Sequence, residues 1–72
     1  MKILAQIDTS REGNDDYLHE VWSLVDVFGV TIGLRIYKWS GWAEQLTTAQ
    51  EYSLSEMEID HPEILQRLLD WL

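Results

Sequence analysis

The clearest pattern in the sequence is an alternation of aliphatic and other residues between Val30 and Trp39. The aliphatic positions are Val30, Ile32, Leu34 and Ile36. The positions between and just after them include Thr31, Arg35, Tyr37 and Trp39. A period of two residues is typical of a half-buried β-strand, because successive side chains of a strand point to opposite faces. We therefore predict that this segment is the central strand and that its aliphatic face points into the core.

The length of the chain limits how much core it can form. Its 72 residues make one domain, and a domain of this size buries only about 60% of the surface that its unfolded chain exposes. The absence of cysteine excludes disulfides, thiolate catalysis and cysteine-ligated metal sites. No stretch approaches the roughly 20 apolar residues of a membrane-spanning helix, and the first apolar run is too short for a signal peptide. We expect a cytoplasmic protein.

The charge is strongly negative and unevenly distributed. Five basic residues stand against 13 acidic ones, which gives a formal net charge of −8. No basic residue lies between Lys38 and Arg67, where the acidic residues are Glu44, Glu51, Glu56, Glu58, Asp60 and Glu63. Such a surface repels nucleic acid and favours a basic protein partner, a cation or plain solubility. The hydrophobic content of 46% argues against a disordered chain.

The first 29 residues predict a strand followed by a helix. Residues 2–8 are apolar on both faces of an extended chain, as in a strand that is covered on both sides. Asn14 is a typical helix N-cap, and Asp15 and Asp16 would lie in the positive first turn. Apolar residues then recur at helical spacing before Gly29, which would end the helix: Leu18, Val21, Trp22, Val25 and Phe28.

A strand, a helix and a second strand in succession permit a right-handed parallel crossover. In this respect residues 2–37 resemble the opening of universal stress proteins, with Asp8-Thr9-Ser10 in the place of that family's Asp-Gly-Ser turn. The resemblance implies a parallel β-α-β unit and covers about half of the chain. The family's later glycine-rich nucleotide loop has no counterpart here, so nucleotide binding is not carried over to these residues.

The segment after the central strand gives weaker signals. Ser40-Gly41 suits a tight turn, across which Trp39 and Trp42 would pair. Residues 42–50 fit a helix, a strand or a loop equally well. From Glu51 to Ile59 an alternating pattern returns and predicts a strand at the sheet edge, antiparallel to the central one.

The end of the chain predicts a helix. Asp60 would cap it, Pro62 fits the first turn, and Glu63 stands at the capping-box position. A continuous apolar stripe follows, made of Ile64, Leu65, Leu68, Leu69 and Leu72. The predicted order is therefore β-α-β-β-α, an α+β domain in which a three-stranded sheet is covered by two helices.

Few residues suggest catalysis or metal binding. The turn at 8–10 follows a strand, where phosphates often bind, but Arg11 is the one nearby cation and an ordinary turn is the better interpretation. His61 with Asp60 and Glu63 lacks the spacing of three metal ligands and suits helix capping better. The turn serine has no nearby histidine to activate it. We predict no catalytic residue, no metal site and no cofactor.

The four tryptophans carry more information. Trp22 is central in its apolar stripe and is assigned to the core. A domain this small has little room to bury Trp39, Trp42 and Trp71 together, so we expect at least one of them to be exposed. Exposed tryptophans are frequent at the centres of protein interfaces, although aromatics that merely close the ends of a small sheet are an equally good interpretation.

The leading hypothesis is a non-enzymatic acidic protein that occupies a basic site on a partner protein, such as one that normally holds nucleic acid. On the predicted edge strand Glu56 and Glu58 would lie about 6.5 to 7 Å apart, comparable to successive phosphates. Phage inhibitors such as anti-CRISPR proteins and other DNA mimics act in this way, by analogy of size and charge. The predicted contact residues are Glu51, Glu56, Glu58, Asp60, Glu63, Trp39 and Trp42.

Two other functions stay open at this point. A small regulatory or structural module would form a homodimer through its aromatic residues. A small nucleotide binder would resemble half of a universal stress protein. A solvated acidic edge with no binding role is the plain alternative to the leading hypothesis.

Overall fold

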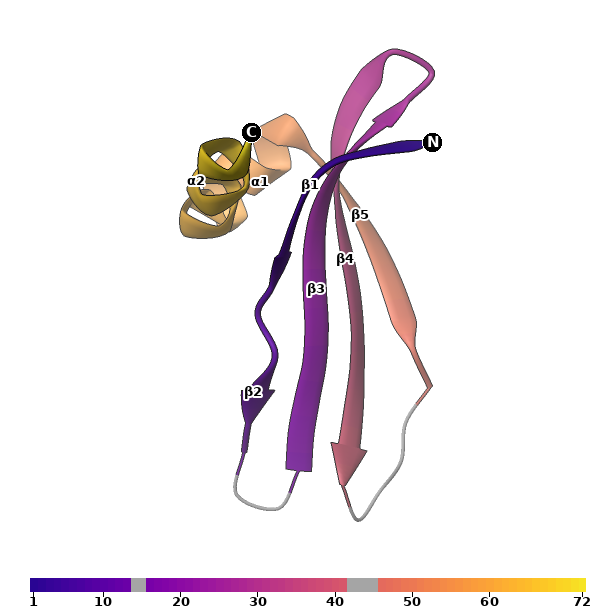
Figure 1. Cartoon of the computed structure of the whole chain (residues 1–72), viewed down its shortest axis with the longest axis vertical. Coiled ribbons are helices and arrows are strands. Elements are labelled where there is room, and N and C mark those ends of the chain that lie inside the picture. Colours follow the sequence, from indigo (N-terminus) through magenta and orange to yellow (C-terminus); the bar gives the residue numbers. More distant parts are fainter. Residues whose placement is uncertain (14–15, 42–45) are drawn as a thin grey trace.

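An antiparallel sheet with two helices on one of its faces makes up the described chain, which comprises residues 1–13, 16–41 and 46–72 of the computed structural model. The elements are β1 (Lys2–Asp8), β2 (Arg11–Glu12), β3 (Asp16–Val27), β4 (Val30–Gly41), β5 (Thr48–Ser53), α1 (Leu54–Asp60) and α2 (Pro62–Trp71). The strand order is β1-β3-β4-β5, and β2 pairs with the far end of β3. Figure 1 shows both helices beside one end of the sheet, while the end near β2 extends past them. The predicted α+β class is confirmed, but the sheet has five strands rather than three.

The helix predicted for the segment ending at Phe28 is wrong, because residues 16–27 form β3. This strand pairs with β1 on one side and with β4 on the other. Leu24 and Val25 are both buried although they point to opposite faces. A strand with buried residues on both faces shows no clean alternation, and short apolar runs then look alike in helices and strands. The predicted cap Asn14 lies outside the described residues.

The parallel crossover implied by the resemblance to universal stress proteins is likewise absent from the described ranges. Every pair of strands there is antiparallel, and the chain passes from β3 to β4 through a hairpin rather than through a helix. The nucleotide-binding alternative depended on that crossover and has no structural support in the described residues.

Phe28 and Gly29 form the two-residue turn of the β3–β4 hairpin, since Val27 pairs with Val30. Both turn residues have positive φ, 51° at Phe28 and 84° at Gly29. This is the pattern of a type I′ turn, whose twist matches that of the strands it joins. Glycine adopts such a φ without strain, whereas phenylalanine does not. Gly29 therefore has the left-handed conformation predicted for it, but in a hairpin and not at a helix end.

The strain at Phe28 leads to a stability prediction. We expect Phe28→Asn to raise the free energy of unfolding by roughly 1 kcal/mol, because asparagine tolerates the left-handed conformation. The phenylalanine ring is fully exposed, so its removal sacrifices little packing. Phe28→Ala is the control, since it removes the ring without relieving the backbone. Urea denaturation measures both variants. A stabilisation by alanine as large as that by asparagine would show that the backbone conformation is not the cause.

The edge strand predicted from Glu51 to Ile59 is right only in its first part. β5 lies at the edge of the sheet and pairs antiparallel with β4, as predicted, but it ends at Ser53. There the Ser53 hydroxyl accepts a hydrogen bond from the Glu56 backbone N–H (3.1 Å), and the Glu56 carboxylate accepts one from the Ser53 N–H (3.1 Å). This capping box starts α1 and overrides the alternating pattern.

The final helix is confirmed as α2, with small corrections at its start. Pro62 occupies its first turn as predicted, and Leu65 and Leu68 are buried. Its N-cap residue is His61 and not Asp60, which is the last residue of α1. Leu69 is 47% exposed, so the apolar stripe of the sequence is wider than the face that the helix buries.

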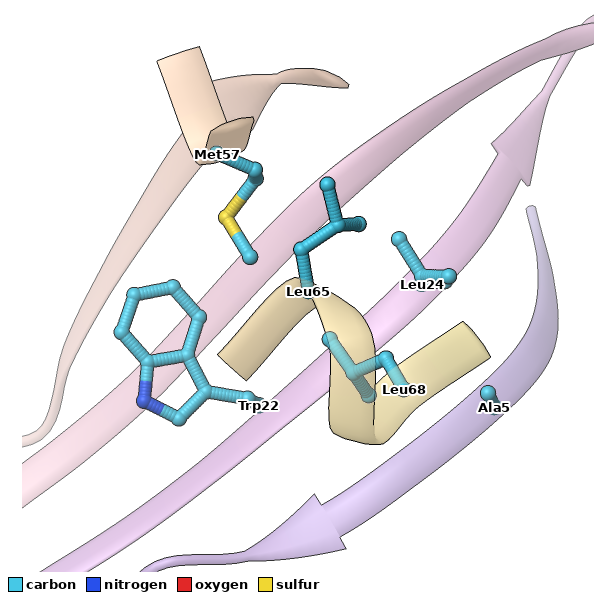
Figure 2. Packing of buried hydrophobic residues seen from close by; sticks show 6 residues of the cluster. All are labelled: Ala5, Trp22, Leu24, Met57, Leu65 and Leu68. Atoms are coloured by element: carbon cyan, nitrogen blue, oxygen red, sulfur yellow. The ribbon is translucent and has the colours of Figure 1, made fainter. Parts of the chain in front are cut away.

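The core lies between the helices and one face of the sheet. Figure 2 shows Trp22 and Leu24 of β3 beneath Leu65 and Leu68 of α2, with Met57 of α1 beside them. Gly33 of β4 faces Met57 so closely that an added Cβ would lie 2.8 Å from its sulfur. A larger residue here would therefore force the Met57 side chain to shift. Its neighbours of the same face along β4 are Thr31, Arg35, Tyr37 and Trp39.

We expect Gly33→Ala to lower the free energy of unfolding by about 1 to 3 kcal/mol, the usual effect of overpacking. Met57 is fully buried and has little room to retreat. Combining Gly33→Ala with Met57→Ala should cost less than the sum of the two single changes, because Met57→Ala removes the clash with the added methyl group and that methyl group fills part of the cavity. Thermal unfolding of the three variants measures this coupling, and strict additivity would contradict the close approach.

The aliphatic residues of β4 point away from the helices. The prediction that this aliphatic face points into the core is therefore wrong. Because Gly33 faces α1, the alternate positions Val30, Ile32, Leu34 and Ile36 lie on the other face. No helix of the described residues covers that face. We call it the open face, and its rows are given by the register: Ile3–Val25–Ile32–Ser53, Gln6–Ser23–Leu34–Glu51 and Asp8–Val21–Ile36–Ala49.

Candidate functional site: an acidic helical layer

The two helices carry a concentration of carboxylates on their solvent side. We call this surface the acidic helical layer and define it by five exposed residues, Glu56, Glu58, Asp60, Glu63 and Asp70. Arg67 is the one basic residue of the two helices. The layer is therefore strongly negative, and four of the predicted contact residues lie on it.

The structure changes the geometry of those four residues. Glu56 and Glu58 lie on α1 and not on a strand, so the predicted spacing of about 6.5 to 7 Å along one strand face does not apply. Residues two apart on a helix do not face each other. Glu56 also holds the capping box with one oxygen, which leaves Glu58, Asp60 and Glu63 as the carboxylates without a capping role.

The other predicted contact residues lie elsewhere. Glu51 is on β5 in register with Leu34, and it therefore belongs to the open face on the opposite side of the sheet. Trp39 is half-buried on β4 opposite Leu18. Trp42 lies outside the described residues. The structure thus does not bring the predicted glutamates and tryptophans together in one patch.

Apolar side chains break up the acidic helical layer. Ile59 is 80% exposed between Glu58 and Asp60, and Trp71 near the end of α2 is 62% exposed. The exposure of Trp71 confirms that at least one tryptophan lies on the surface. The exposure of Ile59 was not predicted from the sequence, because the predicted strand placed this residue at an ordinary alternating position. The Ser53-x-x-Glu56 capping signal would have placed α1 and revealed it.

A buried ion pair on the helix-facing side of the sheet was also missed. Glu20 of β3 is almost fully buried, and its carboxylate binds Nε and Nη2 of Arg35 on β4 and the Thr9 hydroxyl. The Arg35 guanidinium lies 4.0 Å from the centre of the Tyr37 ring. Its Nη1 donates to Gln50 Oε1 (3.3 Å), which also accepts from the Tyr52 hydroxyl (2.8 Å). The predicted helix left Glu20 outside its apolar stripe, so the sequence did not indicate that this carboxylate is buried.

The surroundings of Glu20 act on its acidity in opposite directions. Burial raises its pKa, whereas hydrogen bonds from Thr9, Arg35 and Trp22 and the charge of Arg35 lower it, and the net pKa lies below the ordinary value. Glu20 is therefore ionised at neutral pH and fully engaged. Every buried polar side-chain atom of the described residues has a hydrogen-bond partner, so this cluster offers no group to a ligand and serves to fix the register of β3 against β4.

A shallow hollow of about 290 Å³ lies at the β2 end of the open face. His19 and Lys38 flank it, and Val21 and Ile36 form its apolar floor. The His19 Nε2 atom is 3.2 Å from the Ser40 hydroxyl. Asp8 accepts a hydrogen bond from the Ser10 backbone N–H (2.8 Å), and its hydrogen bonds with Ser10 lower the pKa of its carboxyl.

The turn at 8–10 serves the sheet. The Ser10 hydroxyl accepts from the Glu20 backbone N–H (3.0 Å), and the Thr9 hydroxyl binds the Glu20 carboxylate. These contacts favour the interpretation of residues 8–10 as an ordinary turn and not as a phosphate site.

The described residues contain no group of three or more histidine, cysteine or acidic side chains arranged to hold a metal ion. Neither helix is long and apolar enough to cross a membrane. Comparisons with protein-family models, with curated proteins and with solved structures found no match to this chain.

Proposed function

We propose that this protein is a non-enzymatic binding protein whose acidic helical layer occupies a basic site on a partner protein. The observation that carries the proposal is Ile59, an 80% exposed isoleucine that stands between Glu58 and Asp60 on a short helix. An apolar anchor with charges around it is the composition of a protein interface, where the anchor supplies affinity and the charges supply speed and selectivity.

The partner site that fits this surface is basic at its rim and has an apolar recess. The carboxylates would steer such a partner over a screening length of roughly 10 Å at 0.1 M salt. One form of this function is the mimicry of nucleic acid, by which some phage inhibitors block a nucleic-acid-binding protein. Glu56 and Asp60 are four residues apart on α1, so their side chains start about 6 Å apart on one face, close to the spacing first expected on a strand.

The test compares two pairs of charge-neutralising substitutions. Glu58→Gln with Asp60→Asn removes two charges from the acidic helical layer and spares the capping box. Glu12→Gln with Glu51→Gln is the matched control, because it removes the same charge from exposed positions on the sheet. Proteins captured by the wild type should bind the first pair at least tenfold more weakly, about 1.4 kcal/mol, and bind the control pair nearly as well.

The measurement is association kinetics with the purified captured partner at low and high salt. The wild type should associate faster at low salt, and the first pair should lose most of that advantage while melting at the same temperature. Equal losses from both pairs would indicate a general effect of net charge and would contradict the proposal. A single-stranded or duplex oligonucleotide that competes for the partner would support the mimic form, and its failure to compete would restrict the function to a basic site unrelated to nucleic acid.

A further inference from the structure

The open face carries the most regular aliphatic pattern of the sequence and has no cover. In an antiparallel sheet with one solvated face, that face is normally polar. Here Ile3 is 56% exposed, Val30 61% and Ile36 40%, while Val21, Ile32 and Leu34 are half-buried and only Val25 and Ser23 of the central strand β3 are buried by their neighbours within the sheet. The residues come from three adjacent strands and lie in neighbouring rows of the register. Leu34 connects the row of Ile3, Val25 and Ile32 to the row of Val21 and Ile36, so the aliphatic side chains form a connected stripe, although Gln6, Ser23 and Glu51 share the row of Leu34.

The charge of the open face differs from that of the rest of the chain. Among the described residues its acidic side chains are Asp8, Glu12 and Glu51, and the same face carries the paired residues Lys38 and His19. The five carboxylates of the acidic helical layer lie on the other side of the sheet. In a chain of net charge −8, the open face is therefore the surface on which two identical molecules approach with the least repulsion.

The size of the open face suits an interface between two copies. β3 and β4 have 12 residues each, about 40 Å at 3.3 Å per residue, and four strands span roughly 15 Å. A face of roughly 600 Å² in projection has an accessible area near the ~800 Å² that each partner contributes to a stable complex. Two sheets pack face to face with their strands within about 30° of each other and their inner side chains interdigitated.

We propose that a second copy of this chain covers the open face, so that the two sheets form a β-sandwich with both helical pairs on the outside. The aliphatic rows would then become a second core between the sheets. The interface is aliphatic, in contrast to the aromatic dimer that was one alternative from the sequence, because Trp22, Tyr37 and Tyr52 face the helices. Both acidic helical layers stay accessible in this dimer, so the proposal does not depend on the proposed binding function.

The experiment measures the molar mass by sedimentation velocity at concentrations from micromolar to millimolar. We expect the wild type to dimerise and Ile36→Glu to raise the dissociation constant by about a hundredfold, since a two-fold interface contains the substitution twice. Ile59→Glu is the matched control, because it places the same charge on an exposed isoleucine of the acidic helical layer. It should dimerise like the wild type.

Circular dichroism accompanies each measurement to show that the variants are folded. If Ile36→Glu fails to fold, Ile36→Thr keeps a β-branched residue at the position and should still weaken the dimer by about tenfold. A wild type that stays monomeric at millimolar concentration would overturn the proposal. So would a dimer that both Ile36 variants leave intact, or one that the Ile59 control abolishes, because the contact would then lie on another surface.

Discussion

Arg35→Ala is expected to lower the free energy of unfolding by about 3 kcal/mol at neutral pH, the lower end of the range for breaking a buried ion pair. The cost comes from Glu20, whose side chain is only 5% exposed and would be left ionised without its cation. The lower end applies because Arg35 is 22% exposed and because Glu20 keeps hydrogen bonds from Thr9 and Trp22. Urea denaturation measures the change.

The pH dependence separates this explanation from simple loss of packing. In the wild type the pKa of Glu20 is lowered, so its stabilising contribution is present above the unfolded pKa of about 4.3 and is lost as the pH falls through the folded value. Without Arg35, burial should dominate and raise the pKa of Glu20. As the pH falls, protonation of Glu20 then removes the cost of its unpaired buried charge in the variant. The difference between wild type and variant should therefore shrink between about pH 7 and about pH 4. A difference that stays constant would assign the loss to packing of the guanidinium on Tyr37.

The double variant Glu20→Leu with Arg35→Leu serves as the control for this pair. Replacement of a buried ion pair by apolar residues is often neutral, whereas removal of one partner is not. We therefore expect the double variant to be more stable than Arg35→Ala. A double variant that is less stable would show that the ion pair itself is a net source of stability.

Leu68→Ala is expected to lower the free energy of unfolding by about 2 to 5 kcal/mol. Leu68 is fully buried between α2 and the sheet, where it belongs to the same cluster as Ala5 and Leu24 (Figure 2). A chain of this size has a total stability of roughly 4 to 11 kcal/mol, from about 0.05 to 0.15 kcal/mol per residue. The substitution therefore removes a large share of the stability and leaves a visible unfolded population on mild heating.

Leu69→Ala is the matched control, since it is the same change one residue along the helix. Leu69 is 47% exposed, so the expected loss is below about 1 kcal/mol. Thermal and urea unfolding of the two variants compare them directly. Equal losses would mean that α2 is rotated about its axis relative to the described packing.

Local signals were sufficient for the parts of the fold that depend on neighbouring residues. Pro62 and the leucines after it determined α2, because a proline in the first turn and a stripe at helical spacing fit nothing else. The alternation after Val30 determined β4, and the apolar run after Lys2 determined β1. The lack of basic residues between Lys38 and Arg67 was sufficient to predict an acidic surface, although not its position on two helices.

Tertiary contacts decided what the local pattern left ambiguous. The segment from Asp16 to Val27 fits a helix or a buried strand by periodicity, and pairing with β1 and β4 on both sides made it a strand. The end of β5 is an exception, because it was decided locally by two reciprocal hydrogen bonds between Ser53 and Glu56, whose capping signal is present in the sequence beside the alternating pattern. Glu20 and Arg35 are 15 residues apart in the chain, and only the register of β3 against β4 brings them together.

The local sequence pattern was least sufficient for deciding which face of β4 the helices cover. Alternation determines that Val30, Ile32, Leu34 and Ile36 share one face, but not which face the helices cover. That choice depended on Gly33, which is the position of β4 where the absence of a side chain lets Met57 of α1 approach. The helices therefore packed on the face with Gly33, and the aliphatic rows were left on the other. The sequence by itself determined the two faces of this strand, and the tertiary structure decided which one is inside, because close packing of α1 requires space that only the glycine face provides.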